Sequence, residues 1–218
     1  MLNRNCPNTF ASLRFSIVPV SESIFQKIDE RGCFTNEKMS TQELYDCSWN
    51  FDRLLLRRSE NEERPLIDMQ NDGALNAYAC TDTEKDYPVA FFTLAATSLN
   101  VPPEFRETGK DLNWDNYPSI QIDYLFVDKD LQHHGVGSYI LSWIKMTAKQ
   151  RRYEFEAYRF LFLNAIMTEQ AIRFYKKNDF VIAEEDDQME IEQTLENGLF
   201  VDDKECVVPM FFDLNSLA

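Results

Sequence analysis

Histidine, paired cysteines and long apolar runs are scarce in this sequence, and each scarcity excludes a class of protein. The two histidines, His133 and His134, are neighbours, so a metal site built from several histidines cannot form. The five cysteines are odd in number and lack CxxC spacing, which is typical of reduced thiols in a cytosolic protein. The longest apolar run, Val89 to Thr97, is too short to span a bilayer, and the N-terminus lacks a signal-peptide h-region. We therefore expect a soluble cytoplasmic protein without a metal ion.

Positive charge is also scarce. The 218 residues include 22 Lys and Arg against 37 Asp and Glu, which gives a formal net charge of −15. Affinity for nucleic acid rests on lysine and arginine that displace counterions, so this balance disfavours nucleic acid and anionic membranes as partners. The apolar content of 44% is typical of a globular protein, and the chain is long enough to bury a sizeable core. We expect a single domain over residues 1–218.

The first half of the chain shows patterns of both strands and helices. Ser23 with Gln26, and Ser40 with Glu43, are capping-box pairs, so each is expected to begin a helix. The expected strands are 14–20, 75–81 and 88–98, the last two antiparallel with a turn in 82–86; the expected helices are 21–30 and 40–56, and the expected loops are 57–72 and 101–118.

The second half alternates between strands and helices more regularly. Val136, Ile140 and Ile144 recur at four-residue spacing, which predicts an amphipathic helix directly after a β-branched strand. Thr168 is expected to cap a second helix. In order, we expect strand 119–127, turn 128–134, helix 135–150, strand 159–163, helix 168–177 with Ala171, Phe174 and Tyr175 on its inner face, strand 181–183, an acidic connection 184–205 and strand 207–214. This order predicts an α/β sheet with helices on both faces.

One short motif points to chemistry. Two of the six glycines lie in QHHGVG, residues 132–137, between a strand and a helix. A helix N-terminus presents unpaired N–H groups, and residues without a Cβ let the backbone close around an anion. The motif lacks the Lys-Ser/Thr of a Walker loop and the third glycine of a dinucleotide fingerprint. It predicts a ligand that brings a pyrophosphate without a protein-held magnesium; a tight turn that needs glycine only for its backbone is the alternative.

These residues resemble the GNAT superfamily of acyl-CoA N-acyltransferases, roughly over 75–214 and most specifically over 120–180. The family's Q/R-x-x-G-x-G/A turn matches Gln132, Gly135 and Gly137, after a strand that ends at Val127. Residues 171–180, AIRFYKKNDF, are similar to the family's A-x-x-F-Y-x-K-x-G-F. Asp179 stands where glycine is usual, and aspartate tolerates the left-handed conformation that this turn requires.

The resemblance implies a fold and a cosubstrate. The expected fold is a central, mostly antiparallel twisted sheet with a splayed parallel pair and helices on both faces. The expected activity is transfer of an acetyl group from acetyl-CoA to an amine, without a metal, by one N-acetyltransferase domain whose cofactor-binding core covers about 119–180. The residues implied to contact acetyl-CoA are Leu125, Phe126, Val127, Gln132, His133, His134, Gly135, Val136, Gly137, Ser138 and Asn164, the last of which is taken to end its strand.

The catalytic groups also follow from the resemblance. Tyr175 occupies the family's general-acid position, and the backbone N–H near Val127 would stabilise the oxyanion. Many relatives place a glutamate base where this chain has Gln121, which cannot serve. Asp123 lies two residues on, on the same face of the strand, and is the nearest substitute. A water chain, or an acceptor amine of low pKa, is a third route.

The acceptor stays open among several classes. A small cationic amine or a peptide amine would suit an acidic protein, yet we interpret the acidic stretch 184–205 as a solvated loop. The strand PVAFFTLA, residues 88–95, resembles that of toxin-type GNATs, which acetylate the amino acid on charged tRNA; Arg57-Arg58 and 149–152 are the best basic candidates for such a contact. A non-catalytic acyl-CoA-binding module is a further alternative. The sequence is compatible with a homodimer.

Overall fold

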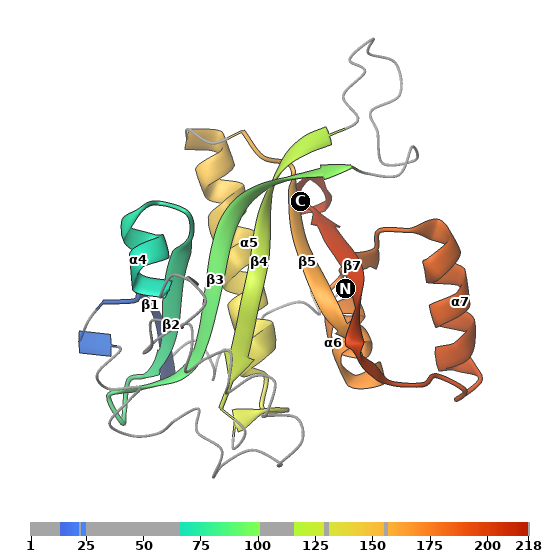
Figure 1. Cartoon of the computed structure of the whole chain (residues 1–218). Coiled ribbons are helices and arrows are strands. Elements are labelled where there is room, and N and C mark those ends of the chain that lie inside the picture. Colours follow the sequence, from blue (N-terminus) through green and yellow to red (C-terminus); the bar gives the residue numbers. More distant parts are fainter. Residues whose placement is uncertain are drawn as a thin grey trace, which may run out of the picture. The chain divides into compact units, whose positions relative to one another are not determined.

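The computed structural model describes residues 14–21, 23–24, 66–100, 116–128, 131–154 and 157–217 (Figure 1). The expected helices 21–30 and 40–56 lie almost entirely outside these residues, as do the greater parts of the expected loops, Arg57, Arg58 and three of the five cysteines. Contacts divide the chain into two compact units, Met1–Ala95 with Tyr124–Trp143, and Ala96–Asp123 with Ile144–Ala218. The expectation of a single domain stays a prediction.

Within the described residues, seven strands form one hydrogen-bonded sheet in the order β1-β2-β3-β4-β5-β7-β6. The pairings β1–β2, β2–β3, β5–β7 and β6–β7 are antiparallel, and β4–β5 is parallel. The mixed fold with a mostly antiparallel sheet and one parallel pair is thereby confirmed. The strands are β1 Phe15–Pro19, β2 Asn76–Asp82, β3 Tyr87–Asn100, β4 Asn116–Val127, β5 Phe160–Met167, β6 Val181–Ile182 and β7 Asp203–Asp213.

The helices of the described residues are α4 Leu66–Asn71, α5 Val136–Glu154, α6 Glu169–Lys177 and α7 Glu185–Glu196, with a short 3-10 helix at Leu214–Ser216. Helix α4 corrects the expected loop 57–72. Proline is favoured at the start of a helix, and Pro65 directly precedes this one. The Gln70 amide then donates to the Val20 carbonyl at 3.0 Å and accepts from the Ala77 N–H at 2.9 Å, and contacts of this kind leave no mark in the local sequence.

Helix α7 corrects the interpretation of the acidic stretch as a loop. Ile191 and Leu195, four residues apart, are both buried and give the helix an apolar stripe. Glu192 forms an ion pair with Lys176 of α6. Six of the ten acidic residues of 184–205 therefore lie on a packed helix rather than on a solvated loop. Strand bounds also differ: β4 begins at Asn116, inside the expected loop 101–118, β5 continues to Met167, and β7 begins at Asp203, inside the expected connection 184–205.

Each unit has its own apolar core. In the first, Val20, Leu75, Ala77, Ala79 and Phe91 form a buried cluster. In the second, Leu99, Phe160 and Phe211 do so, and the rings of Phe160 and Phe211 meet edge to face with centroids 5.5 Å apart. Edge-to-face geometry is favoured for aromatic pairs, so these rings pack as a core.

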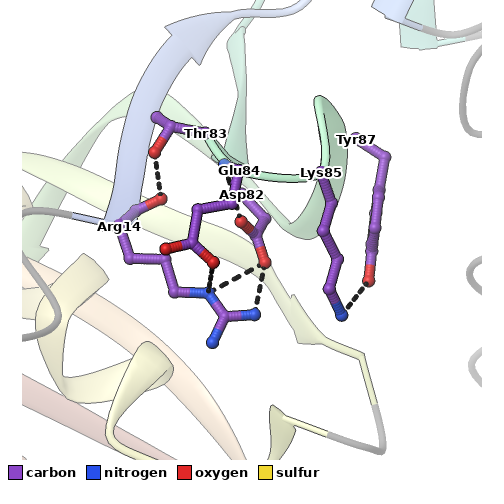
Figure 2. Close-up of polar contacts among 6 residues, drawn as sticks. All are labelled: Arg14, Asp82, Thr83, Glu84, Lys85 and Tyr87. Carbon is purple, nitrogen blue, oxygen red and sulfur yellow. Dashed lines mark hydrogen bonds and ion pairs between the residues drawn. The ribbon is translucent and has the colours of Figure 1, made fainter.

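The turn between β2 and β3 lies where the sequence predicts it, and Arg14 holds it in place (Figure 2). Asp82 is fully buried and accepts from Arg14 Nη2 at 2.6 Å and from the Glu84 N–H at 3.0 Å. Burial raises the pKa of Asp82, but these hydrogen bonds outweigh it, and the net pKa is below the ordinary value. The buried carboxylate is therefore a satisfied structural anchor of the first unit.

Candidate functional site

The QHHGVG motif forms the turn between β4 and α5 in the first unit. The Gln132 side chain donates to the Val127 carbonyl at 3.2 Å, which ties the turn to the end of β4. His133 and Gly135 have positive φ angles of 61° and 86°. A Cβ on Gly135 would meet no atom within 4 Å, so glycine is required there by the backbone angle and not by crowding. Gly135 is exposed, and the space beside it is open.

The N-terminus of α5 follows directly. Its ladder begins with the Tyr139 N–H, which donates to the Gly135 carbonyl at 2.9 Å. Among the described residues, no acceptor pairs with the N–H groups of Val136, Gly137 and Ser138. Val136 is buried, so it can meet a ligand only through its backbone. Three free N–H groups at the positive end of a long helix, beside an open glycine, fit an anion such as a pyrophosphate.

The two histidines lie at the rim of this turn. His133 and His134 are both exposed, and His134 Nδ1 is 2.7 Å from the Gln132 carbonyl oxygen. The side chains of His133 and His134 therefore lie at the two positions of the turn where the Q/R-x-x-G-x-G/A motif allows any residue. They are not part of a buried catalytic site.

The parallel pairing between β4 and β5 is short. Parallel pairing between β4 and β5 covers only Ser119–Gln121 with Phe160–Phe162. On its other edge β4 follows β3, where the Asp128 N–H donates to the Val89 carbonyl at 2.8 Å. The parallel ladder with β5 therefore does not include Leu125–Val127, and the Val127 carbonyl accepts from the Gln132 side chain.

The aromatic residues of this strand end face the core of the first unit. Tyr124 and Phe126 pack against the buried cluster, and their stacked rings have centroids 5.9 Å apart. Because side chains alternate along a strand, Leu125 and Val127 face the opposite side. Phe126 can therefore contribute to a ligand site through its backbone alone.

Tyr175 lies on α6 in the second unit. Thr168 caps this helix as expected, since its hydroxyl accepts from the Ala171 N–H at 3.3 Å. Ile172 is fully buried, and Ala171, Phe174 and Tyr175, which the sequence places on the inner face, are half-buried.

The surroundings of the Tyr175 phenol are apolar. Its ring meets those of Phe174 and Phe180 at centroid distances of 5.0 and 5.9 Å. Burial raises the pKa of Tyr175 to about 12. No described residue hydrogen-bonds the hydroxyl. The hydroxyl is thus a protonated donor that is available to a ligand.

The turn after α6 keeps the geometry that the family's glycine would give. Asp179 has φ 62°, so aspartate adopts the left-handed conformation as expected. The Asp179 N–H donates to the Lys176 carbonyl at 3.0 Å, and the Phe180 N–H donates to the Tyr175 carbonyl at 3.1 Å. This pattern is a Schellman C-cap, which ends α6 at Lys177 with Asn178 as the C-cap residue.

Asp123 and Gln121 share one face of β4, as strand alternation predicts. The Gln121 amide donates to Asp123 Oδ1 at 2.5 Å. Burial raises the pKa of Asp123, and the Gln121 hydrogen bond opposes that rise. A carboxylate with a raised pKa is a stronger base than an ordinary one, so the geometry is suitable for accepting a proton.

Asn164 differs from its expected place. It is exposed and lies in the middle of β5, in register with Pro209 of β7, because β5 continues three residues further. The candidate residues thus fall into two sets. The first unit holds Leu125 to Ser138, and the second holds Asp123, Asn164 and Tyr175.

The sequence analysis missed Lys145, which is buried on α5 and contacts the turn after α6. Its signal was available, because Lys145 lies four residues after the buried Leu141, on the apolar stripe of the helix. In the part of the chain that the structure describes, no group of three or more His, Cys, Asp or Glu residues is placed to hold a metal ion. Among the same residues, none of the helices has the length and apolarity needed to cross a membrane.

Comparison with known families gives a match over part of the chain. Residues 96–182 match the family model described as the acetyltransferase (GNAT) domain. This segment is therefore similar to a GNAT acetyltransferase domain. The match contains Asp123, the QHHGVG turn, Asn164 and Tyr175, so the resemblance to the GNAT superfamily is confirmed, and with it the class of enzyme, an acetyltransferase. None of the curated proteins matches the chain.

Solved structures share the GNAT fold. AtaT complexed with acetyl-methionyl-tRNAfMet has a TM-score of 0.59 at 15% identity, over 93% of this chain and 96% of that one. AtaTR bound with AcCoA has a TM-score of 0.58 at 16% identity, over 93% and 95%. A tyrosine-to-phenylalanine variant of the toxin AtaT, bound to the C-terminus of the antitoxin AtaR, has 0.56 at 14%, over 93% and 95%. At these identities the likeness is one of fold.

Proposed function

We propose that this GNAT chain transfers the acetyl group of acetyl-CoA to a primary amine. The observation that carries the proposal is the QHHGVG turn, with its positive-φ Gly135, its open space and three helix N–H groups that have no acceptor among the described residues. In the proposal, these N–H groups bind the pyrophosphate, while Gln132 holds the turn to β4. The end of β4 at Leu125–Val127, beyond the short parallel ladder with β5, binds the pantetheine arm, and the Val127 N–H stabilises the oxyanion.

Tyr175 is the proposed donor to the leaving sulfur. An ordinary thiol has a pKa of about 8.5. The pKa of Tyr175 is raised to about 12, so the phenol remains protonated at neutral pH and donates a hydrogen bond as negative charge develops on sulfur. The amine nitrogen first adds to the thioester carbon and forms the oxyanion; the carbon–oxygen double bond then re-forms as the carbon–sulfur bond breaks, and the sulfur leaves as the thiol after it takes the phenol proton. Solvent then returns a proton to Tyr175.

Asp123 is the proposed base. The acceptor must lose a proton before its nitrogen can attack, and Asp123 takes that proton directly or through a water molecule. Support comes from its raised pKa and from its position on the face of β4 that also presents Gln121.

For the acceptor, a small cationic amine or a peptide amine is the first candidate. The formal charge of −15 favours a cationic substrate and disfavours a polyanion. Of the basic residues considered for tRNA, Lys149 donates to the Leu217 carbonyl, and Arg152 donates to Asn215 Oδ1 at 2.5 Å, so both already contact the C-terminal segment.

Aminoacyl-tRNA is the second candidate acceptor. The fold likeness to AtaT, which was solved with acetyl-methionyl-tRNAfMet, and the strand Phe91-Phe92-Thr93-Leu94-Ala95 favour it. Both acceptors present a primary amine to the same acetyl-CoA site, so the two candidates differ in the surface that binds the rest of the acceptor.

A binding assay and a transfer assay on the full chain test the proposal. Thermal shift with acetyl-CoA is expected to raise Tm, because a ligand that binds only the folded state stabilises it. Thiol release is then followed with polyamines, lysine peptides, aminoglycosides and aminoacyl-tRNA. Release with a small amine supports the first candidate, and release only with aminoacyl-tRNA supports the second. Acetyl-CoA binding without release from any acceptor would support the non-catalytic module and overturn the proposal.

A further inference from the structure

Lys145 is a buried cation that none of the proposed chemical steps uses. Only 7% of the residue is exposed. Its ammonium lies 3.9 Å from the centroid of the Phe212 ring and 5.4 Å from that of Phe180. Cations are attracted to aromatic faces within about 6 Å, so both rings contribute to holding this one.

The ammonium is directed at the turn that ends α6. It donates to the backbone carbonyl of Asn178 and lies 3.2 Å from Asp179 Oδ2. The C-terminal end of a helix carries partial negative charge and unpaired carbonyl groups, so a cation there is stabilised. Burial lowers the pKa of Lys145, while Asp179 raises it. Asp179 itself is 79% exposed, so the carbonyl of Asn178 is the better-shielded partner.

The same turn is bonded directly to Tyr175. The N–H groups of Asn178 and Phe180 both donate to the Tyr175 carbonyl, at 3.0 and 3.1 Å. The Phe180 ring, which lies beneath the Lys145 ammonium, also meets the Tyr175 ring edge to face. Backbone and side chain of Tyr175 are thus both held by residues that Lys145 holds.

An apolar residue in place of Lys145 would avoid the free energy that is needed to desolvate a buried charge. Burying an ammonium requires several kcal/mol of desolvation, and replacement of a buried ionic group by a hydrophobic one is often neutral or stabilising. The buried cation at this position therefore indicates a role in fixing the geometry of the turn after α6, rather than a contribution to the free energy of unfolding. It lies where a left-handed aspartate stands in place of the family's glycine.

We propose that Lys145 is a positioning residue for Tyr175, which holds the turn 178–180 so that the phenol keeps its place at the reacting sulfur. This inference rests on the proposed role of Tyr175 as the donor. Misplacement of a catalytic group by about 1 Å can lower the rate by about a hundredfold, so loosening this turn has a measurable effect on kcat.

A double-mutant cycle in the full chain tests it. Lys145→Met keeps the aliphatic volume against Phe212 and removes the cation. It is expected to lower kcat about tenfold, with the acetyl-CoA Kd unchanged within about twofold. In a Tyr175→Phe background the same change is expected to lower kcat less than about twofold, because the donor it positions is gone. Lys145→Arg, which keeps a cation that can donate to the Asn178 carbonyl, is expected to restore most of kcat.

Lys85→Met is the matched control. It removes a lysine whose ammonium contacts Tyr87 at the β2–β3 turn rather than the turn after α6. It is expected to leave kcat unchanged. Asp179→Asn removes only the exposed carboxylate and tolerates the left-handed angle; it is expected to lower kcat about two- to threefold, and this variant serves if Lys145→Met does not fold.

The outcomes separate this inference from the proposed function. If Tyr175→Phe has wild-type kcat, the proposed function of Tyr175 fails and the inference fails with it. If Tyr175→Phe is slow but Lys145→Met has wild-type kcat, or lowers kcat equally in both backgrounds, the positioning role alone is overturned.

Discussion

The candidate residues include two left-handed turns, and these turns are built in opposite ways. The turn before α5 contains Gly135 at φ 86°, exposed and with no neighbour where a Cβ would be. The turn after α6 contains Asp179 at φ 62°, beside the buried Lys145 and the ring of Phe180. The first turn leaves backbone N–H groups free, which suits an anion. The second uses side-chain packing to hold one residue, Tyr175.

This difference predicts which measured property, acetyl-CoA binding or kcat, changes when each turn is mutated. A turn built from backbone is sensitive to any side chain that changes its angle, and its loss should appear as weaker binding. A turn built from side chains tolerates a change of residue at its left-handed position, provided that its partners remain, and its loss should appear in kcat. Substitutions in each turn test this separation, and they are taken in order of decreasing effect.

Removing the Tyr175 hydroxyl should affect kcat most. Tyr175→Phe is expected to lower kcat by about a hundredfold or more, because general acid catalysis contributes about 10²- to 10⁴-fold. The acetyl-CoA Kd should not change, since the phenol acts at the sulfur and not at the pyrophosphate. Steady-state kinetics and calorimetry on the same samples measure the two quantities. If acetyl-CoA binding weakened by the same factor as kcat, the two turns would not have separate roles in binding and in catalysis.

The pH dependence of kcat gives an independent check on the same residue. With a pKa of about 12, Tyr175 stays protonated through the usual assay range, so its ionisation should cause no decrease in kcat up to about pH 10. A decrease near pH 9 that disappears in Tyr175→Phe would show that the phenol is less buried than its surroundings imply.

Asp123→Asn is expected to have the next largest effect. A general base acts as the carboxylate, so kcat/KM should fall as pH drops through the pKa of Asp123, which burial raises above its ordinary value. The variant should lose about ten- to a hundredfold in kcat/KM at neutral pH and should lack that acidic limb. Gln121→Leu removes the hydrogen bond that lowers this pKa, so the limb should move to higher pH. If the decrease in kcat/KM at low pH persisted in Asp123→Asn, Asp123 would not be the general base. A water chain or an acceptor amine of low pKa would then be the route for the proton.

Gly135→Ala should weaken acetyl-CoA binding with little change in kcat. The left-handed region is disfavoured for alanine by about 1–2 kcal/mol, so Kd is expected to rise about fivefold to thirtyfold as the turn relaxes. Gly198→Ala is the matched control: Gly198 has φ 65°, and a Cβ added there would also meet no atom within 4 Å, but it follows α7 rather than the candidate turn. An equal rise in Kd for both variants would indicate general strain rather than a binding site.

Thr168→Ala should have the smallest effect. Loss of the N-cap hydrogen bond to the Ala171 N–H is expected to lower the free energy of unfolding by about 1 kcal/mol. Urea unfolding measures this change, and kcat should remain within about twofold because the opposite end of α6 holds Tyr175. A large decrease in kcat would show that the cap, and not the turn after α6, controls the position of the phenol.

Local patterns predicted much of this fold, because their causes are local. The β2–β3 turn, the Thr168 cap, the QHHGVG turn and the left-handed Asp179 follow from residue types within a few positions. Helices α4 and α7 were missed because their supports are distant: Gln70 bonds Val20, and Glu192 pairs with Lys176. Acidity obscured the Ile191–Leu195 stripe of α7.

The candidate site shows the same division. Its backbone part could be predicted from one six-residue motif, whereas the support of Tyr175 depends on Lys145, 33 residues from Asn178 in the chain. Asn164 was misplaced because β5 extends beyond its apolar run, into residues whose strand pairing with β7 is the deciding contact.

Calorimetric titration of acetyl-CoA into the wild-type chain tests most directly whether the turn of the first region is a cofactor site. Saturable binding of one acetyl-CoA per chain is expected, with Kd in the range of about 1 μM to 1 mM that is usual for enzyme substrates, and weaker binding to Gly135→Ala. An absence of binding at millimolar acetyl-CoA, or equal affinity in wild type and Gly135→Ala, would contradict a cofactor site built from this turn.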